Sequence, residues 1–196
     1  VVTIAHEGGH AAVAALTGRR LHGVRLHSDT SGLTVSSGKP TGPGMVCTLA
    51  AGYLAPSVLG LGGVVLLGTG HITALLWVAV VLLAAMLVLI RNVYGVVSVV
   101  GTGGMLVALS WFTSPAVQGA FGYLLVWFLL VAAPRPVLEV RRLRRRGRGA
   151  DSDPDQLARL TRVGAGWWIA LFGVLTAAAA VYGAYWLLPW GTTNAL

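Results

Sequence analysis

The sequence predicts an α-helical polytopic membrane protein with about six transmembrane helices and a short β-hairpin after the first. Three observations support this fold class. The chain is 56% hydrophobic and only 10% charged, with a mean hydropathy of +0.77, which is typical of membrane proteins. Long apolar runs recur along it, separated by short polar stretches. Between the first two runs, apolar and polar residues alternate with the period of a β-strand.

The first membrane segment is predicted over residues 1–17 and ends before Arg19 and Arg20. Only five residues precede His6, whereas a spanning helix needs roughly 20 apolar residues, so we expect further residues upstream.

A β-hairpin insertion is predicted within the polar stretch that follows, residues 19–43. Val24 and Leu26 alternate with polar residues, as do Leu33 and Val35, on either side of a turn-forming cluster at residues 28–32. We expect this hairpin on the cytoplasmic side of the membrane.

Five further spans are expected, at residues 45–67, 72–90, 93–112, 116–133 and 163–188. Pro56 should kink the first of these, because proline removes a helical hydrogen bond and neighbouring helices can satisfy the freed group. Before the last span lies a predicted cytoplasmic loop, residues 134–156, with a basic run followed by three aspartates. We interpret residues 1–196 as a single membrane-embedded domain.

The positive charges indicate the orientation. If the basic run is cytoplasmic, alternating spans bring all fourteen Lys and Arg residues to that side. The opposite loops, near Gly68 and Thr113, carry none. Such asymmetry is typical of a multi-pass protein whose basic loops face the cytoplasm, and the Gly-, Ala-, Val- and Arg-rich composition points to a bacterial plasma membrane. The net charge of +8 is therefore interpreted as a topology signal and not as a nucleic-acid-binding surface.

The basic run, residues 141–148, has two interpretations. It could bind anionic lipid head groups, or it could be a solvated orientation signal. We favour the second from the sequence.

The candidate chemistry lies in His6-Glu7-Gly8-Gly9-His10, an H-E-x-x-H pattern. On a helix, His6 and His10 lie one turn apart on one face, so both imidazoles can bind one metal ion. Glu7 lies beside them, where it can accept a proton from the attacking water. The alternative is a polar helix end with two hydrogen-bonded histidines, but ionisable groups are costly in so apolar a segment.

A third metal ligand must come from elsewhere, because catalytic zinc usually has three protein ligands. The candidates on the predicted cytoplasmic side are His22, His27, Asp29, Glu139, Asp151, Asp153 and Asp155. The two histidines lie in or next to the hairpin, where a mobile loop would hold a metal poorly. Asp153 also reads as the N-cap of a helix, with Pro154 at the first helical position, and capping would compete with metal binding. Spacing alone does not choose between Asp151, Asp153 and Asp155.

These features together resemble the site-2 protease superfamily, and most closely its bacterial M50B-type membrane zinc metallopeptidases. The likeness extends over residues 6–40, 51–56, 91–95 and 152–161. It implies an intramembrane zinc metalloendopeptidase in which His6 and His10 bind Zn²⁺ and Glu7 is the catalytic base. In that superfamily the third ligand is a later aspartate, usually within Leu-Asp-Gly. This chain has no Leu-Asp-Gly sequence, and its Ser152-Asp153 pattern assigns the role to Asp153.

Asn92 is a further candidate, because its amide is the only one flanked by two predicted spans. Resemblance to superfamily asparagines near the zinc implies a contact with the substrate or its oxyanion. The alternative, which we prefer, is a residue at a helix junction.

The implied partners are a membrane-spanning or membrane-proximal protein substrate and the lipid bilayer; the sequence does not indicate an oligomeric state. The unpaired edge of the hairpin would hold an extended substrate, and Gly8 and Gly9 would leave backbone open to it. The missing Leu-Asp-Gly sequence keeps one alternative open, a non-catalytic M50-like membrane scaffold or partner-binding subunit. A transporter or channel would show buried charges in several spans or paired broken helices, and the sequence shows neither.

Overall fold

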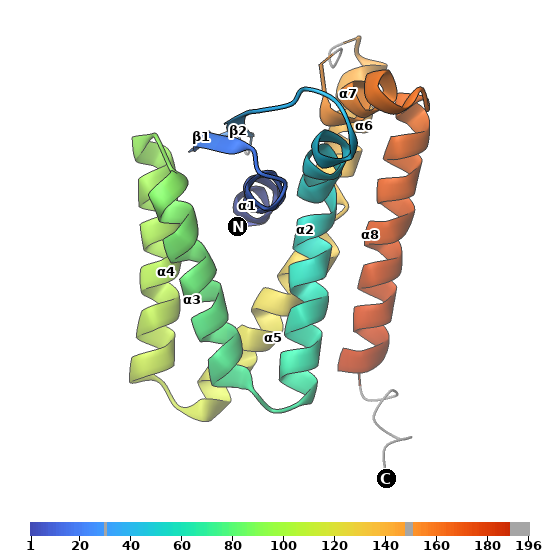
Figure 1. Ribbon diagram of the computed structural model, residues 1–196. Coiled ribbons are helices and arrows are strands. Elements are labelled where there is room, and N and C mark those ends of the chain that lie inside the picture. The colour runs from blue at the N-terminus through green and yellow to red at the C-terminus, as the bar shows by residue number, and fades with distance from the viewer. Residues whose placement is uncertain (30, 148–150, 189–196) are drawn as a thin grey trace.

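The computed structural model describes residues 1–29, 31–147 and 151–188. Long helices stand side by side, and α1 lies across them near one end, seen almost end-on beside the hairpin (Figure 1). The elements are α1 (Val2–Leu16), β1 (Arg20–Leu26), β2 (Gly32–Ser37), α2 (Pro43–Gly68), α3 (Ile72–Leu89), α4 (Val93–Phe112), α5 (Pro115–Ala132), α6 (Arg135–Arg145), α7 (Asp153–Thr161) and α8 (Ala165–Leu187).

Within the described residues, five helical segments are long and apolar enough to cross a membrane: α2, α3, α4, α5 together with α6, and α8. The predicted fold class, a multi-pass helical protein with a hairpin after its first helix, is confirmed. The predicted first span, residues 1–17, does form a helix, but it is not one of the five. The described α1 has 15 residues, a rise of about 22 Å, whereas the hydrocarbon core is about 30 Å thick.

Three prolines lie within or at the start of helices without interrupting them. Pro56 lies buried inside α2, which runs through it without interruption. Pro134 and Pro136 lie at the start of α6, where a missing N–H costs little because first-turn N–H groups have no helical partner. Within the predicted loop at residues 134–156, residues 135–145 therefore form a helix, which contains most of the basic run.

The hairpin is anchored to the helical body through the outer edge of β1. β1 and β2 pair antiparallel, with an irregularity between Leu21 and Gly23. The other edge of β1 meets the end of α3, where Val24 bridges to Ile90 and the Arg91 N–H donates to the Val24 carbonyl over 2.9 Å. The predicted hairpin is therefore fixed to the helical body and does not hang free.

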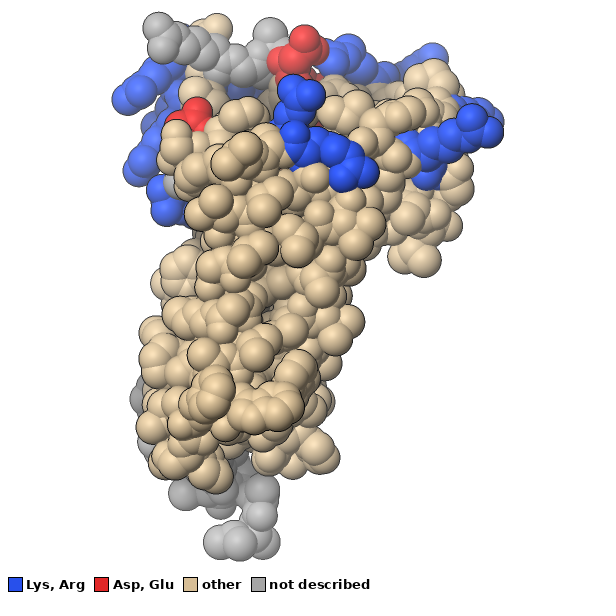
Figure 2. Space-filling view, turned by 90° about the vertical axis from the view of Figure 1, so that its left-hand side faces the viewer, with Lys and Arg blue, Asp and Glu red and all other residues tan. Residues whose placement is uncertain are grey.

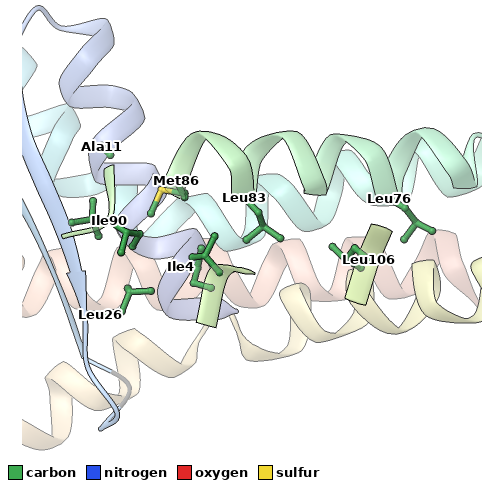
Figure 3. Packing of buried hydrophobic residues seen from close by; sticks show 10 residues of the cluster. Ile4, Ala11, Leu26, Leu76, Leu83, Met86, Ile90 and Leu106 are labelled. Carbon is green, nitrogen blue, oxygen red and sulfur yellow. The ribbon is translucent and has the colours of Figure 1, made fainter. Parts of the chain in front are cut away.

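The first helix is fixed by apolar packing. Ile4 and Ala11 belong to a buried cluster with Leu26 of the hairpin and with α3 residues such as Met86 (Figure 3). On another side, Gly9 meets α2 so closely that an added Cβ would lie 2.5 Å from the Ala55 Cβ. This corrects the expectation for Gly9, whose missing side chain lets α2 approach and does not leave backbone open to a substrate.

Charge is distributed unevenly along the long axis. Figure 2 shows Lys and Arg gathered at the end of the molecule that carries the hairpin and α7 in Figure 1, above a body without Lys, Arg, Asp or Glu on the visible face. Because this body consists of the five candidate spans, the basic end marks one membrane surface.

Candidate metal centre

The two motif histidines converge on one point. His6 and His10 lie one turn apart on α1, and their Nε2 atoms are 3.1 Å from each other. His10 is buried and His6 half-buried. The local spacing therefore produces the paired nitrogen donors that the sequence predicts.

Asp153, at the start of α7, completes a cluster with them. Its Oδ2 lies 3.4 Å from His10 Nε2 and 4.0 Å from His6 Nε2. In a tetrahedral site with bonds of about 2.0–2.1 Å, the donor atoms lie about 3.4 Å apart. Within the described part of the chain, this is the one group of three or more His, Cys, Asp or Glu residues that could hold a metal ion.

A backbone carbonyl fixes the orientation of His10. Its Nδ1 lies 2.7 Å from the Thr48 carbonyl oxygen, which can only accept, so Nδ1 carries the proton. In the neutral ring the lone pair is then on Nε2, which faces His6 and Asp153. Metal-binding histidines are commonly held in this way.

Glycines make room for the reactive side chains. A Cβ added to Gly52 of α2 would overlap the His10 ring at Nε2 and Cε1, and a Cβ at Gly32 would lie 2.6 Å from Glu7 Oε1. Only glycine lets α2 and β2 approach His10 and Glu7 so closely. The donor set, its spacing and this cradle fit a bound metal ion.

The Glu7 side chain is buried. In the sequence Glu7 directly follows His6. Thr34 of β2 donates a hydrogen bond from Oγ1 to Glu7 Oε2 over 2.5 Å. The hairpin thus orients the Glu7 carboxylate. The Asp153 side chain is 24% exposed and lies on the more open side of the cluster.

The comparison with known families agrees with this geometry. The sequence model of the family described as "Peptidase M50B-like" matches residues 1–183. The chain belongs to this family. No curated protein and no solved structure gives a match. Membership in the M50B-like family suggests a metallopeptidase, and it confirms the resemblance inferred from the sequence.

Two other candidate ligands of this M50B-like chain are engaged elsewhere. Asp151 is paired with Arg159 over 3.1 Å. Asp155 is paired with Arg144 and also accepts a hydrogen bond from Ser152. Neither belongs to the cluster around His6 and His10.

The expected N-cap at Asp153 is wrong by one residue. Ser152 is the N-cap of α7, and its carbonyl accepts hydrogen bonds from the N–H groups of Asp155 and Gln156. Asp153 is the first residue of α7 and not its cap, and its carboxylate faces His6 and His10, so capping and metal binding do not compete for the same carboxylate.

The hairpin candidates also lie outside the cluster. His22 Nε2 contacts the Ser37 hydroxyl at 2.7 Å, and His27 Nδ1 lies 3.3 Å from that of Ser31. Hydrogen bonds from the Ser31 side chain and backbone lower the pKa of Asp29 below its usual range, which ties this carboxylate to the turn.

Asn92 contacts the hairpin through both ends of its amide. Its Nδ2 donates to the Leu26 carbonyl over 2.6 Å, and its Oδ1 accepts from the Leu26 N–H over 3.1 Å. With donor and acceptor both engaged, this geometry favours the helix-junction interpretation over a direct contact with substrate.

Four contributors to the site were not predicted from the sequence: Gly32, Thr34, Gly52 and the Thr48 carbonyl. Gly52 falls within a stretch that resembles the family, but the pattern carries no sign of contact with His10. The Thr48 carbonyl belongs to the backbone, so no residue type could have signalled it.

Proposed function

We propose that this chain is an intramembrane zinc metalloendopeptidase that cleaves a membrane-spanning or membrane-proximal protein. In this proposal His6, His10 and Asp153 hold Zn²⁺, and Glu7 is the catalytic base. The observation that carries it is the approach of the Asp153 carboxylate, from the far end of the chain, to both motif histidines. Membership in the M50B-like family supports it.

Zn²⁺ at this site would act as a Lewis acid, polarising the scissile carbonyl and making water more acidic. Glu7 accepts the proton of the attacking water and delivers it to the leaving amine. The hydrogen bond from Thr34 keeps that carboxylate in place between the two transfers. The Thr48 carbonyl holds His10 in the tautomer that leaves Nε2 free to coordinate.

The substrate must be extended where it is cut, because a helix locks its carbonyl groups in hydrogen bonds. The hairpin offers a way to hold such a segment. Within the described residues the sheet has two strands, so one edge of β2 is unpaired. Thr34 places β2 directly beside Glu7, and a peptide added to that edge would pass close to the base.

The proposed location is the bacterial plasma membrane, with the basic end in the cytoplasm. Concentration of Lys and Arg at one end of an apolar body supports this orientation (Figure 2). The partners are the protein substrate and the bilayer itself.

The chain offers a matched test, because Glu139 is its only other glutamate and is exposed on α6. Wild type, Glu7→Gln and Glu139→Gln would be expressed in cells lacking the native gene, and new N-termini in membrane proteins would be mapped by terminal labelling. We expect cleavage within or beside membrane spans for wild type and Glu139→Gln, none for Glu7→Gln, and equal zinc content in all three. The same new termini with Glu7→Gln would leave the non-catalytic scaffold as the better description.

A further inference from the structure

A groove between α6 and α8 lies apart from the metal cluster. It encloses about 740 Å³ and is lined by α6 residues from Val137 to Arg145 and by α8 residues from Gly166 to Ala177. One end carries arginines and the rest is apolar. Since α8 is a candidate span, the groove runs from a membrane surface toward the apolar interior.

The apolar part is a trough made by small side chains. Gly166, Ala170, Gly173 and Ala177 of α8 line it, at spacings that keep them on one helix face. Across from them is Val137, whose Cγ1 would lie 3.8 Å from a Cβ added to Gly173. A linear hydrocarbon chain fits such a trough, and polar ligands would find no partner there.

The charged part is formed by three arginines on the same face of α6. Arg144 is paired with Asp155 of α7. Arg141 and Arg145 are exposed and form no ion pair with any described carboxylate. At about 3.6 residues per turn, Glu139 falls on the opposite side of the helix. Two guanidinium groups are therefore available where the apolar trough reaches the surface.

We propose that this groove binds an anionic phospholipid, with the phosphate on Arg141 and Arg145 and an acyl chain along the α8 trough. Guanidinium groups bind phosphate through paired, charge-assisted hydrogen bonds. Anionic lipids are enriched in the cytoplasmic leaflet. The proposal replaces the solvated orientation signal as the interpretation of these two arginines, and it does not depend on hydrolytic activity.

The test uses the purified full chain in neutral detergent, titrated with dioleoylphosphatidylglycerol and followed by native mass spectrometry. Arg141→Ala/Arg145→Ala is compared with Arg142→Ala/Arg146→Ala, which removes equal charge from two neighbouring arginines that do not line the groove. We expect the groove pair to weaken binding about tenfold more than the control pair. Dioleoylphosphatidylcholine should bind far more weakly, and glycerol 1-phosphate should not compete.

A second comparison tests the apolar trough. Gly173→Leu fills it, whereas Gly101→Leu on α4 adds the same side chain where nothing lies within 4 Å. Only Gly173→Leu should weaken phosphatidylglycerol binding, with thermal unfolding checked for each variant. If Gly173→Leu fails to fold, the comparison of the two arginine double variants still tests whether the groove binds the lipid. Equal losses in both arginine pairs, or competition by glycerol 1-phosphate, would overturn the proposal.

Discussion

Thr34 donates a hydrogen bond from its hydroxyl to the Glu7 carboxylate over 2.5 Å. This bond joins the second strand of the hairpin to the first helix, beside the two histidines. It gives the hairpin a direct effect on the proposed catalytic base, in addition to any part in holding substrate.

Replacing Thr34 by valine removes this donor while keeping the shape of the side chain. A hydrogen bond to a charged group contributes about 1.5–3 kcal/mol, so cleavage should fall about 10- to 100-fold without loss of zinc. The rate of substrate cleavage and the zinc content of the same preparation measure this. Thr34→Ser restores the hydroxyl and should recover most of the rate; a valine variant as active as wild type would contradict the role.

Removing the Asp153 carboxylate should release the metal. Asp153→Asn is expected to weaken zinc binding at least about 100-fold, because it removes a direct ligand and even outer partners of ligands contribute 10- to 100-fold. Asp151→Asn is the matched control, since its side chain is 93% exposed. Zinc would be measured after dialysis against buffered free zinc. Equal zinc in both variants would exclude Asp153 as a ligand.

Gly52→Ala should abolish metal binding with every ligand still present. The added Cβ would overlap the His10 ring, so the imidazole must leave the cluster or α2 must shift. We expect lost zinc and a stability loss of about 1–3 kcal/mol, as for other overpacked sites. Gly62→Ala on the same helix, where nothing lies within 4 Å, should change neither quantity. Normal zinc binding by Gly52→Ala would show that the contact relaxes.

Asn92→Ala should loosen the hairpin. It removes two hydrogen bonds to the Leu26 backbone, and the free energy of unfolding should fall by about 1–3 kcal/mol while zinc affinity is kept. Faster hydrogen exchange in residues 20–26 and 32–37, with a lower Tm, would be the signature. A loss of cleavage with unchanged exchange and Tm would instead indicate direct contact with substrate.

The proposed orientation can be checked by labelling. In a Cys47→Ala background, His71→Cys lies in the loop between α2 and α3, and Arg146→Cys lies at the end of α6. A membrane-impermeant maleimide applied to spheroplasts should label the first and reach the second only after permeabilisation. The reverse pattern would place the basic end outside the cell.

Local spacing in the sequence was enough to predict the five later spans, the hairpin and the pairing of His6 with His10. These features depend on the fixed rise and period of helices and strands, which neighbouring residues alone determine. The same is true of Glu7, whose place beside the histidines follows from its position in the motif.

Tertiary packing decided what spacing left open. Three aspartates occur within five residues, and only the start and docking of α7 direct Asp153 to the histidines while Asp151 and Asp155 meet arginines. Packing also turned Asn92 toward Leu26 and brought Thr34 to Glu7. Residues far apart in the chain meet only through the packing of whole elements, so their contacts cannot be derived from local periodicity.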